Sequence, residues 1–133
     1  MSTERAFSGA SWEKDVGYCR AIRRGNHIWV TGTVAVDADG KAVAVGDPEG
    51  QAERCFDIIE AAIGKLGASF ADIVRTRMFV KDIAAHNQAF GQVHGRRFKG
   101  HEPATTMIEV SRFISDEFLI EIEADAFVED TPL

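Results

Sequence analysis

Apolar residues recur along the chain with two different periods, and each period predicts one kind of secondary structure. The strictest alternation of apolar and acidic residues runs through Ile120, Glu121, Ile122, Glu123, Ala124 and Asp125. Successive side chains of a strand point to opposite faces, so this pattern predicts a strand with three carboxylates on one face. Such a row either lies at a solvated sheet edge or places one carboxylate in a cleft, where it handles protons or water. On the pattern alone the solvated edge is the stronger interpretation.

Apolar residues spaced three and four positions apart predict the main helix. The apolar positions of this helix are Ala52, Cys55, Phe56, Ile59, Ala62, Ile63 and Leu66. Asp47 is the expected N-cap, Pro48 the first helical residue, and Gly67 the residue that ends the helix. A second helix is expected to begin at Asp82. Its apolar positions are Ile83, Phe90, Val93 and Phe98.

The remaining apolar runs predict strands. The expected strands are residues 18–22, 27–33, 42–45, 73–80, 105–112 and 117–128. The first two form an expected hairpin around the turn at Gly25 and Asn26. In the strand at 73–80 we expect Val74, Met78 and Val80 to share one face. The last two runs are expected to be joined by a short polar turn.

This order of strands and helices predicts an α+β fold, in which two helices cover one face of a mixed six-stranded sheet. The 133 residues suit one domain, and a hydrophobic content of 45% with 27% charged residues is typical of a soluble globular protein. Residues 1–15 are polar and are expected to be irregular. Because no secretory signal or run of 18 apolar residues is seen, we expect a cytoplasmic protein without a membrane partner.

The net charge and the motifs of the chain argue against nucleic-acid binding, metal sites and cofactors. The formal net charge is −6 and no basic run exceeds two residues, so nucleic acid is not an expected partner. The four histidines lack the spacing of a metal site, so no metal is expected. No glycine-rich phosphate loop and no G-x-S-x-G motif is present, so no cofactor is expected. Two cysteines, Cys19 and Cys55, cannot make a disulfide framework.

Several segments together resemble the RidA/YjgF-type family, the reactive-intermediate deaminases. The run PATTMIEVSR at 103–112, followed by LIEIEA at 119–124, is similar to the family pattern P-A-R-S-x-V-E-V-A-R and V-E-I-E-A. Gly17 and Tyr18 stand where the family has G-P-Y. NHIWVTG at 26–32 resembles its second strand, and DIVRTRMFVKD at 72–82 its D-I-V-K-T-x-V-F-V-K-D. The resemblance spans roughly residues 16–128.

The resemblance implies a chorismate-mutase-like fold and a homotrimer whose sheets meet in a central barrel, with ligand clefts between subunits. It also implies hydrolysis of a small imine or enamine without a cofactor. Glu121 corresponds to the family glutamate that acts on water, and Tyr18 to a tyrosine that lines the cleft. Other cleft positions correspond to Thr31, Gly32, Ala104 and Met107.

Departures from the family pattern concern three positions. Thr105 stands where deaminating members have an arginine whose guanidinium holds the carboxylate of an imino acid. Removing one partner of a buried charge pair costs about 2–5 kcal/mol, so the usual imino-acid specificity is not expected here. His94 replaces a common tyrosine; it is either a proton-shuttling group or a helix residue with a satisfied ring. Arg20 either replaces part of the missing guanidinium or is a surface arginine paired with Glu121 or Glu123.

The resemblance and its departures lead to two functional hypotheses. In the first, the protein hydrolyses a small reactive enamine, imine or related compound in an inter-subunit cleft, with Glu121 as catalytic residue. Its partners are then a small-molecule ligand and further copies of itself. In the second, it is a non-catalytic trimer that binds a small ligand or has a regulatory role. Some relatives are named endoribonucleases, but the charge balance does not support that activity.

Overall fold

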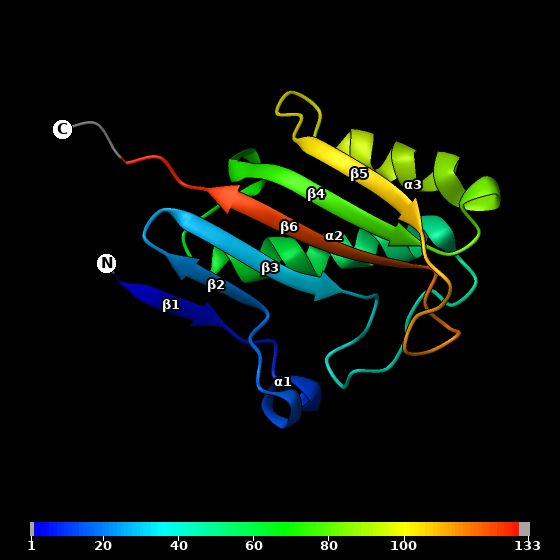
Figure 1. Ribbon diagram of the computed structural model, residues 1–133, viewed down its shortest axis with the longest axis horizontal. Coiled ribbons are helices and arrows are strands. Elements are labelled where there is room, and N and C mark those ends of the chain that lie inside the picture. Colours follow the sequence, from blue (N-terminus) through cyan, green and yellow to red (C-terminus); the bar gives the residue numbers. More distant parts are fainter. Residues whose placement is uncertain (1, 131–133) are drawn as a thin grey trace.

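The computed structural model describes residues 2–130, so the first residue and the last three of the expected domain lie outside it. Six strands and three α-helices follow one another along the chain (Figure 1). Their bounds are β1 (Thr3–Ala6), α1 (Ser11–Val16), β2 (Ala21–Arg24), β3 (His27–Thr33), α2 (Pro48–Gly64), β4 (Ile73–Val80), α3 (Ile83–Arg97), β5 (Ala104–Glu109) and β6 (Ile120–Phe127). A short 3₁₀ turn, Phe70–Asp72, precedes β4.

The strands form one mixed sheet in the order β1-β2-β3-β6-β4-β5. All neighbours are antiparallel except β4 and β5, which are parallel. The long helices α2 and α3 cover the same face of this sheet, as Figure 1 shows. The predicted α+β fold, with a mixed six-stranded sheet and two helices on one face, is therefore confirmed.

The sixth strand is not the one predicted. The run at 42–45 contributes only an isolated bridge between Val36 and Ala42, whereas β1 pairs with β2 at the sheet edge. The expectation that residues 1–15 are irregular was therefore wrong. After β1, the carboxylate of Glu13 in α1 accepts hydrogen bonds from the backbone N–H and the hydroxyl of Ser8. A four-residue edge strand of mostly polar residues has no apolar period by which it could be recognised.

The prediction that a short turn joins the last two strands was also wrong, because β5 and β6 are not neighbours in the sheet. Instead, β4 lies between them and pairs with both. The chain passes from β4 through α3 to β5, and a helical crossover of this kind joins parallel neighbours rather than a hairpin. The strands themselves are shorter than predicted, because residues 110–119 belong to no strand.

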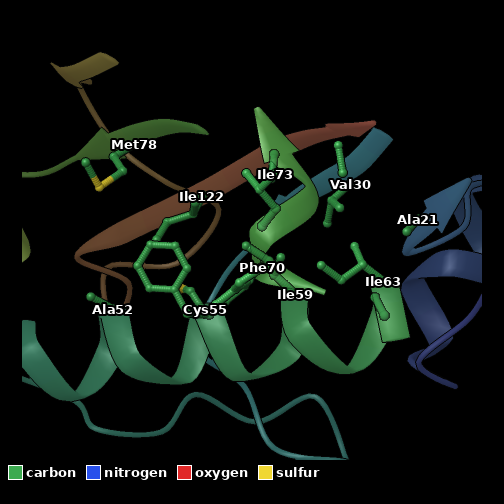
Figure 2. Close-up of a cluster of buried hydrophobic side chains, with 14 of the residues drawn as sticks. Ala21, Val30, Ala52, Cys55, Ile59, Ile63, Phe70, Ile73, Met78 and Ile122 are labelled. Carbon is green, nitrogen blue, oxygen red and sulfur yellow. The ribbon is translucent and has the colours of Figure 1, made fainter. Parts of the chain in front are cut away.

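The alternation in β6 separates the core from the open face. Ile120, Ile122 and Ala124 are fully buried against α2, while the three carboxylates between them point away from the helices. Figure 2 shows Ile122 above the part of α2 that holds Cys55. In the strand at 73–80, the prediction that Val74 shares a face with Met78 and Val80 was wrong. Val74 is 52% exposed, because a β-bulge between Ile73 and Arg75 interrupts the alternation.

The helix boundaries follow the predicted capping residues. Asp47 accepts a hydrogen bond from the backbone N–H of Gly50, and Pro48 is the first residue of α2. α2 ends at Gly64, slightly before the predicted Gly67, whose positive φ of 84° closes the turn that follows. Asp82 immediately precedes α3, as predicted. None of the helices within residues 2–130 is long and apolar enough to cross a membrane.

Candidate functional site

The predicted site residues fall into two groups that lie on different faces of the sheet. Glu121 lies between the buried residues Ile120 and Ile122, so its side chain leaves the face that the helices cover. Thr105 pairs with Thr76 of β4, whose side chain is completely buried on the helix-covered face. Within one chain, therefore, the catalytic candidate and the position of the missing arginine do not meet.

The first group, which we call the Glu121 group, consists of Tyr18, Arg20, Thr31, Gly32 and Glu121. It is built around a bulge in β3. Val30 pairs with Ala124 and Thr33 with Ile122, so Thr31 and Gly32 together face the single residue Glu123 of β6. A Cβ atom at Gly32 would lie 2.6 Å from Oε2 of Glu121. Only glycine lets the carboxylate lie against the backbone here.

Glu121 is half-buried, and its carboxyl has a perturbed pKa. Burial raises the pKa above the usual glutamate value, and the nearby Glu123 raises it further. Arg20 opposes this effect. A carboxyl group whose pKa moves toward neutrality can exchange protons with a substrate or water, and such groups concentrate at functional sites.

Arg20 is only 8% exposed, so the interpretation as a surface arginine was wrong. Its Nη2 donates a hydrogen bond to the carbonyl of Gly32 at 3.1 Å, and its guanidinium lies 5.6 Å from the centre of the Tyr18 ring. Among residues 2–130 it makes no ion pair with either Glu121 or Glu123, and Glu123 pairs with Arg77 at 3.2 Å. Arg20 precedes β2, and three strands separate β2 from β5. In a single chain it does not replace a guanidinium at Thr105.

Thr31 has a positioning role in this arrangement. Its hydroxyl donates to the carbonyl of Cys19 at 2.8 Å, and its backbone N–H donates to the carbonyl of Arg20 at 3.0 Å. The hydroxyl of Thr33 in turn donates to the carbonyl of Thr31 at 2.7 Å. These bonds fix the bulge next to Gly32, and with it the place of the Glu121 carboxylate.

The second group contains His94, Thr105 and a residue that the sequence did not reveal, Thr76. The hydroxyl of Thr76 donates to that of Thr105 at 2.7 Å and is hydrogen-bonded to Nε2 of His94 at 2.8 Å. Since a hydroxyl has one proton to give, the His94 ring is then the donor to Thr76. We call this the His94–Thr76–Thr105 chain.

His94 is 9% exposed and packs against Phe56 and Phe98 of the core. Burial lowers the pKa of its ring, so the ring is neutral at pH 7. This environment is that of a helix residue with a satisfied ring.

The sequence held one sign that Thr76 has a special place, because it is a polar residue on the otherwise apolar face of β4. Met107 packs on the core from the same side as Thr105, whereas Ala104 is exposed.

Comparison with known proteins identifies the family. Residues 10–128 match the sequence model of the family described as Endoribonuclease L-PSP. The chain belongs to this family, and the RidA/YjgF-type resemblance is confirmed. A RutC family protein of Pyrococcus abyssi is 34% identical over 117 residues, which cover 87% of this chain and 91% of the relative.

Solved structures of family members have the same fold as this L-PSP family protein. A member of the YjgF/YER057c/UK114 family from Mycobacterium tuberculosis is 38% identical, with a TM-score of 0.86 over 96% of this chain and 100% of the other. The YjgF gene product of Escherichia coli is 29% identical, with a TM-score of 0.80 over 96% of this chain and 100% of its own.

Other reactive groups of the L-PSP family protein are poorly placed for chemistry. Cys55 is completely buried, and burial raises the pKa of its thiol far above the usual range. Its Sγ donates to the carbonyl of Thr33 at 3.3 Å. Within the described part of the chain, no three His, Cys, Asp or Glu side chains are grouped so that they could hold a metal ion.

Proposed function

We propose that this protein hydrolyses a small reactive imine or enamine without a cofactor, in a cleft between the subunits of a homotrimer. The observation that supports this most directly is the state of Glu121. Its carboxylate is half-buried against Gly32, its pKa is raised, and no described side chain is bonded to it in an ion pair. A carboxyl group in this state can take a proton from water.

The proposed reaction needs only water and Glu121. The substrate reacts as the protonated imine. The water oxygen forms a bond to the imine carbon while Glu121 takes one water proton and the electron pair of the carbon–nitrogen double bond moves to the nitrogen. Glu121 then returns the proton to that nitrogen. The carbon–nitrogen bond breaks and ammonia leaves as the carbon–oxygen double bond forms, and the hydroxyl proton passes to the Glu121 carboxylate, which releases it to water. General acid–base catalysis of this kind accelerates a reaction by roughly 10²–10⁴-fold.

Assembly of several copies is part of the proposal, because the two groups of site residues lie on opposite faces of one sheet. A second copy could bring its β5 edge to the Glu121 group of the first. The open face of the sheet also has exposed apolar side chains suited to burial between subunits, including Trp29, Ile108 and Phe127. Both features support a homotrimer with inter-subunit clefts.

The substrate is expected to be other than a simple imino acid. Thr105 provides a neutral hydroxyl, and that hydroxyl already accepts a hydrogen bond from Thr76. It cannot offer the two parallel charged hydrogen bonds that a guanidinium gives a carboxylate. We therefore expect imines of neutral carbonyl compounds to react faster than 2-iminopropanoate or 2-iminobutanoate.

Ammonia release from imines generated in situ tests this proposal. The wild-type protein should act slowly on 2-iminopropanoate and 2-iminobutanoate, and Thr105→Arg should raise that rate. Glu121→Gln should abolish it in both backgrounds. Rapid wild-type turnover of both imino acids would contradict the expected specificity, whereas full activity of Glu121→Gln would contradict the proposed mechanism.

The second candidate function is a trimer that binds a small ligand without turning it over. The missing guanidinium and the occupied hydroxyl of Thr105 favour it. It predicts that the wild-type protein releases no ammonia from any imine tested, while a small ligand still raises its melting temperature. Catalytic turnover that depends on Glu121 would exclude this candidate.

A further inference from the structure

We propose that a cavity between α1, α2 and the segment after β3 binds a small organic carboxylate with an apolar body. The cavity has a volume of about 350 Å³, within the usual range of small-molecule pockets. Glu121 and the His94–Thr76–Thr105 chain do not line it, but Tyr18 and Arg20 of the Glu121 group do. The cavity therefore adjoins the Glu121 group, its walls come from one chain, and binding there can be measured without any hydrolysis.

Apolar side chains supply most of the cavity wall. Trp12 comes from α1, Ile58 and Ala61 come from α2, and Val34 and Val36 come from the segment after β3. Trp12 remains 41% exposed, although it has an apolar surface beside it. A ligand with a flat apolar body would remove this aromatic surface from water, which is favourable in proportion to the area covered.

The cationic side chains of the cavity point to an anionic ligand. Arg20, Arg54 and Lys65 line it, and none of the three takes part in an ion pair within residues 2–130. Arg54 and Lys65 donate only to the backbone carbonyls of Val36 and Phe7. Neither side chain lies within ion-pair distance of a carboxylate of the described chain, although the charge of Arg54 contributes to the lowered pKa of Asp37.

Arg20 is the least satisfied of these cations. More than nine-tenths of the residue is buried, yet its Nε has no hydrogen-bond partner among the described residues, and Nη2 bonds only the carbonyl of Gly32. The charge of Arg20 acts on the nearby Glu121, but no described carboxylate lies within ion-pair distance of the guanidinium. A buried donor without an acceptor is costly, and a ligand carboxylate beside Nε would supply a charge-assisted hydrogen bond.

Acidic side chains at the same cavity are mostly occupied by other donors. Asp57 accepts a hydrogen bond from Arg97 at 2.6 Å. The carboxylate of Asp37 accepts from the backbone N–H groups of Asp39 and Lys41, and the Lys41 bond lowers its pKa. Asp39 is exposed at the rim. The three acidic and three basic side chains that line the cavity therefore balance formally, and the case for an anionic ligand rests on Arg20, whose buried Nε has no acceptor among the described residues.

Binding of phenylacetate, compared with its neutral analogue phenylacetamide, tests the proposal. The chain has two tryptophans, Trp12 and Trp29, so Trp29→Phe leaves Trp12 as the only tryptophan, whose fluorescence is excited selectively over that of Tyr18. Phenylacetate should change this fluorescence saturably and bind about 10- to 100-fold more tightly than the amide, the ratio expected of one charge-assisted hydrogen-bonded contact. Equal affinity for the two compounds, or saturable binding of neither, would overturn the proposal.

Two substitutions locate the ligand in calorimetric titrations of the full chain. Ala61→Phe fills the cavity from the exposed side of α2 without entering the core and should abolish phenylacetate binding. Thr105→Phe, at the β5 edge, is the matched control and should leave it unchanged. The opposite pattern would place the ligand at the other site. Arg20→Gln should remove the preference for phenylacetate over phenylacetamide. If Arg20→Gln does not fold, because Arg20 is buried, Ala61→Phe still decides whether the ligand binds in the cavity.

Discussion

The Glu121 group and the His94–Thr76–Thr105 chain differ in how their polar atoms are satisfied. In the first, a half-buried carboxylate and a buried guanidinium lie near each other without an ion pair, and burial raises the pKa of the carboxyl. In the second, three neutral side chains form a continuous line of hydrogen bonds 2.7 and 2.8 Å long. Unsatisfied charge is expensive to maintain, whereas a neutral bonded chain stabilises the fold.

This difference assigns different roles to the two regions. Groups that are able to gain or lose a proton belong to the Glu121 group, which is where we place the chemistry. The His94–Thr76–Thr105 chain holds the β5 edge against α3 and presents a neutral hydroxyl at its end. Both regions serve one reaction only if two copies of the protein bring them together.

The largest effect is expected from Glu121→Gln. Removing the proton acceptor while keeping its size should lower imine hydrolysis by about 10²–10⁴-fold, measured as ammonia release. Glu123→Gln is the matched control, because Glu123 lies on the same face but is ion-paired with Arg77. An equal loss of activity in Glu123→Gln would contradict the assignment of Glu121 alone as the catalytic carboxylate, because it would mean that the two carboxylates act together.

Mixing two inactive variants tests whether the two regions meet across a subunit interface. Glu121→Gln and Thr105→Phe each disable one half-site. After they are unfolded and refolded together, about one quarter of the sites should combine the two intact halves, if subunits associate randomly around a symmetric ring. Activity should return to a corresponding fraction. No recovery, although mixed oligomers are shown by mass spectrometry, would place each site within one chain.

Thr76→Val should destabilise the protein by about 1–3 kcal/mol, because it leaves the buried ring of His94 without its partner. Urea unfolding measures this change in the free energy of unfolding. Thr106→Val, on the exposed side of β5, should change it by no more than about 0.5 kcal/mol. Similar values for the two variants would show that the His94–Thr76–Thr105 chain contributes no stability.

The smallest expected effect is a pH-dependent gain in stability in Glu121→Gln. Because the folded-state pKa of Glu121 is raised, the folded protein binds this proton more tightly than the unfolded chain. Wild-type stability should therefore fall as pH rises from the usual glutamate pKa through the folded-state pKa, and then level off. The variant should lack this loss, so its advantage grows over that window and disappears in acid. A constant difference between the two proteins from pH 4 to 8 would contradict the raised pKa.

The sequence predicted much of the fold but not how the site is divided. Capping at Asp47, the apolar face of α2 and the acidic face of β6 are all confirmed, because each depends on neighbours within a few residues. The place of Thr105 could not be predicted this way. It depends on β5 pairing with β4, and strand pairing joins residues that are far apart in the sequence.

The sequence by itself determined the kind of each major element, the family, and the presence of a carboxylate at residue 121, since side-chain period and motif are local properties. Only the tertiary structure decided that β1 forms the sheet edge, that Arg20 is buried, and that Thr105 and Glu121 face opposite ways. The physical reason is that burial and pairing depend on which distant segments pack together, and a one-residue change of register exchanges the two faces of a strand.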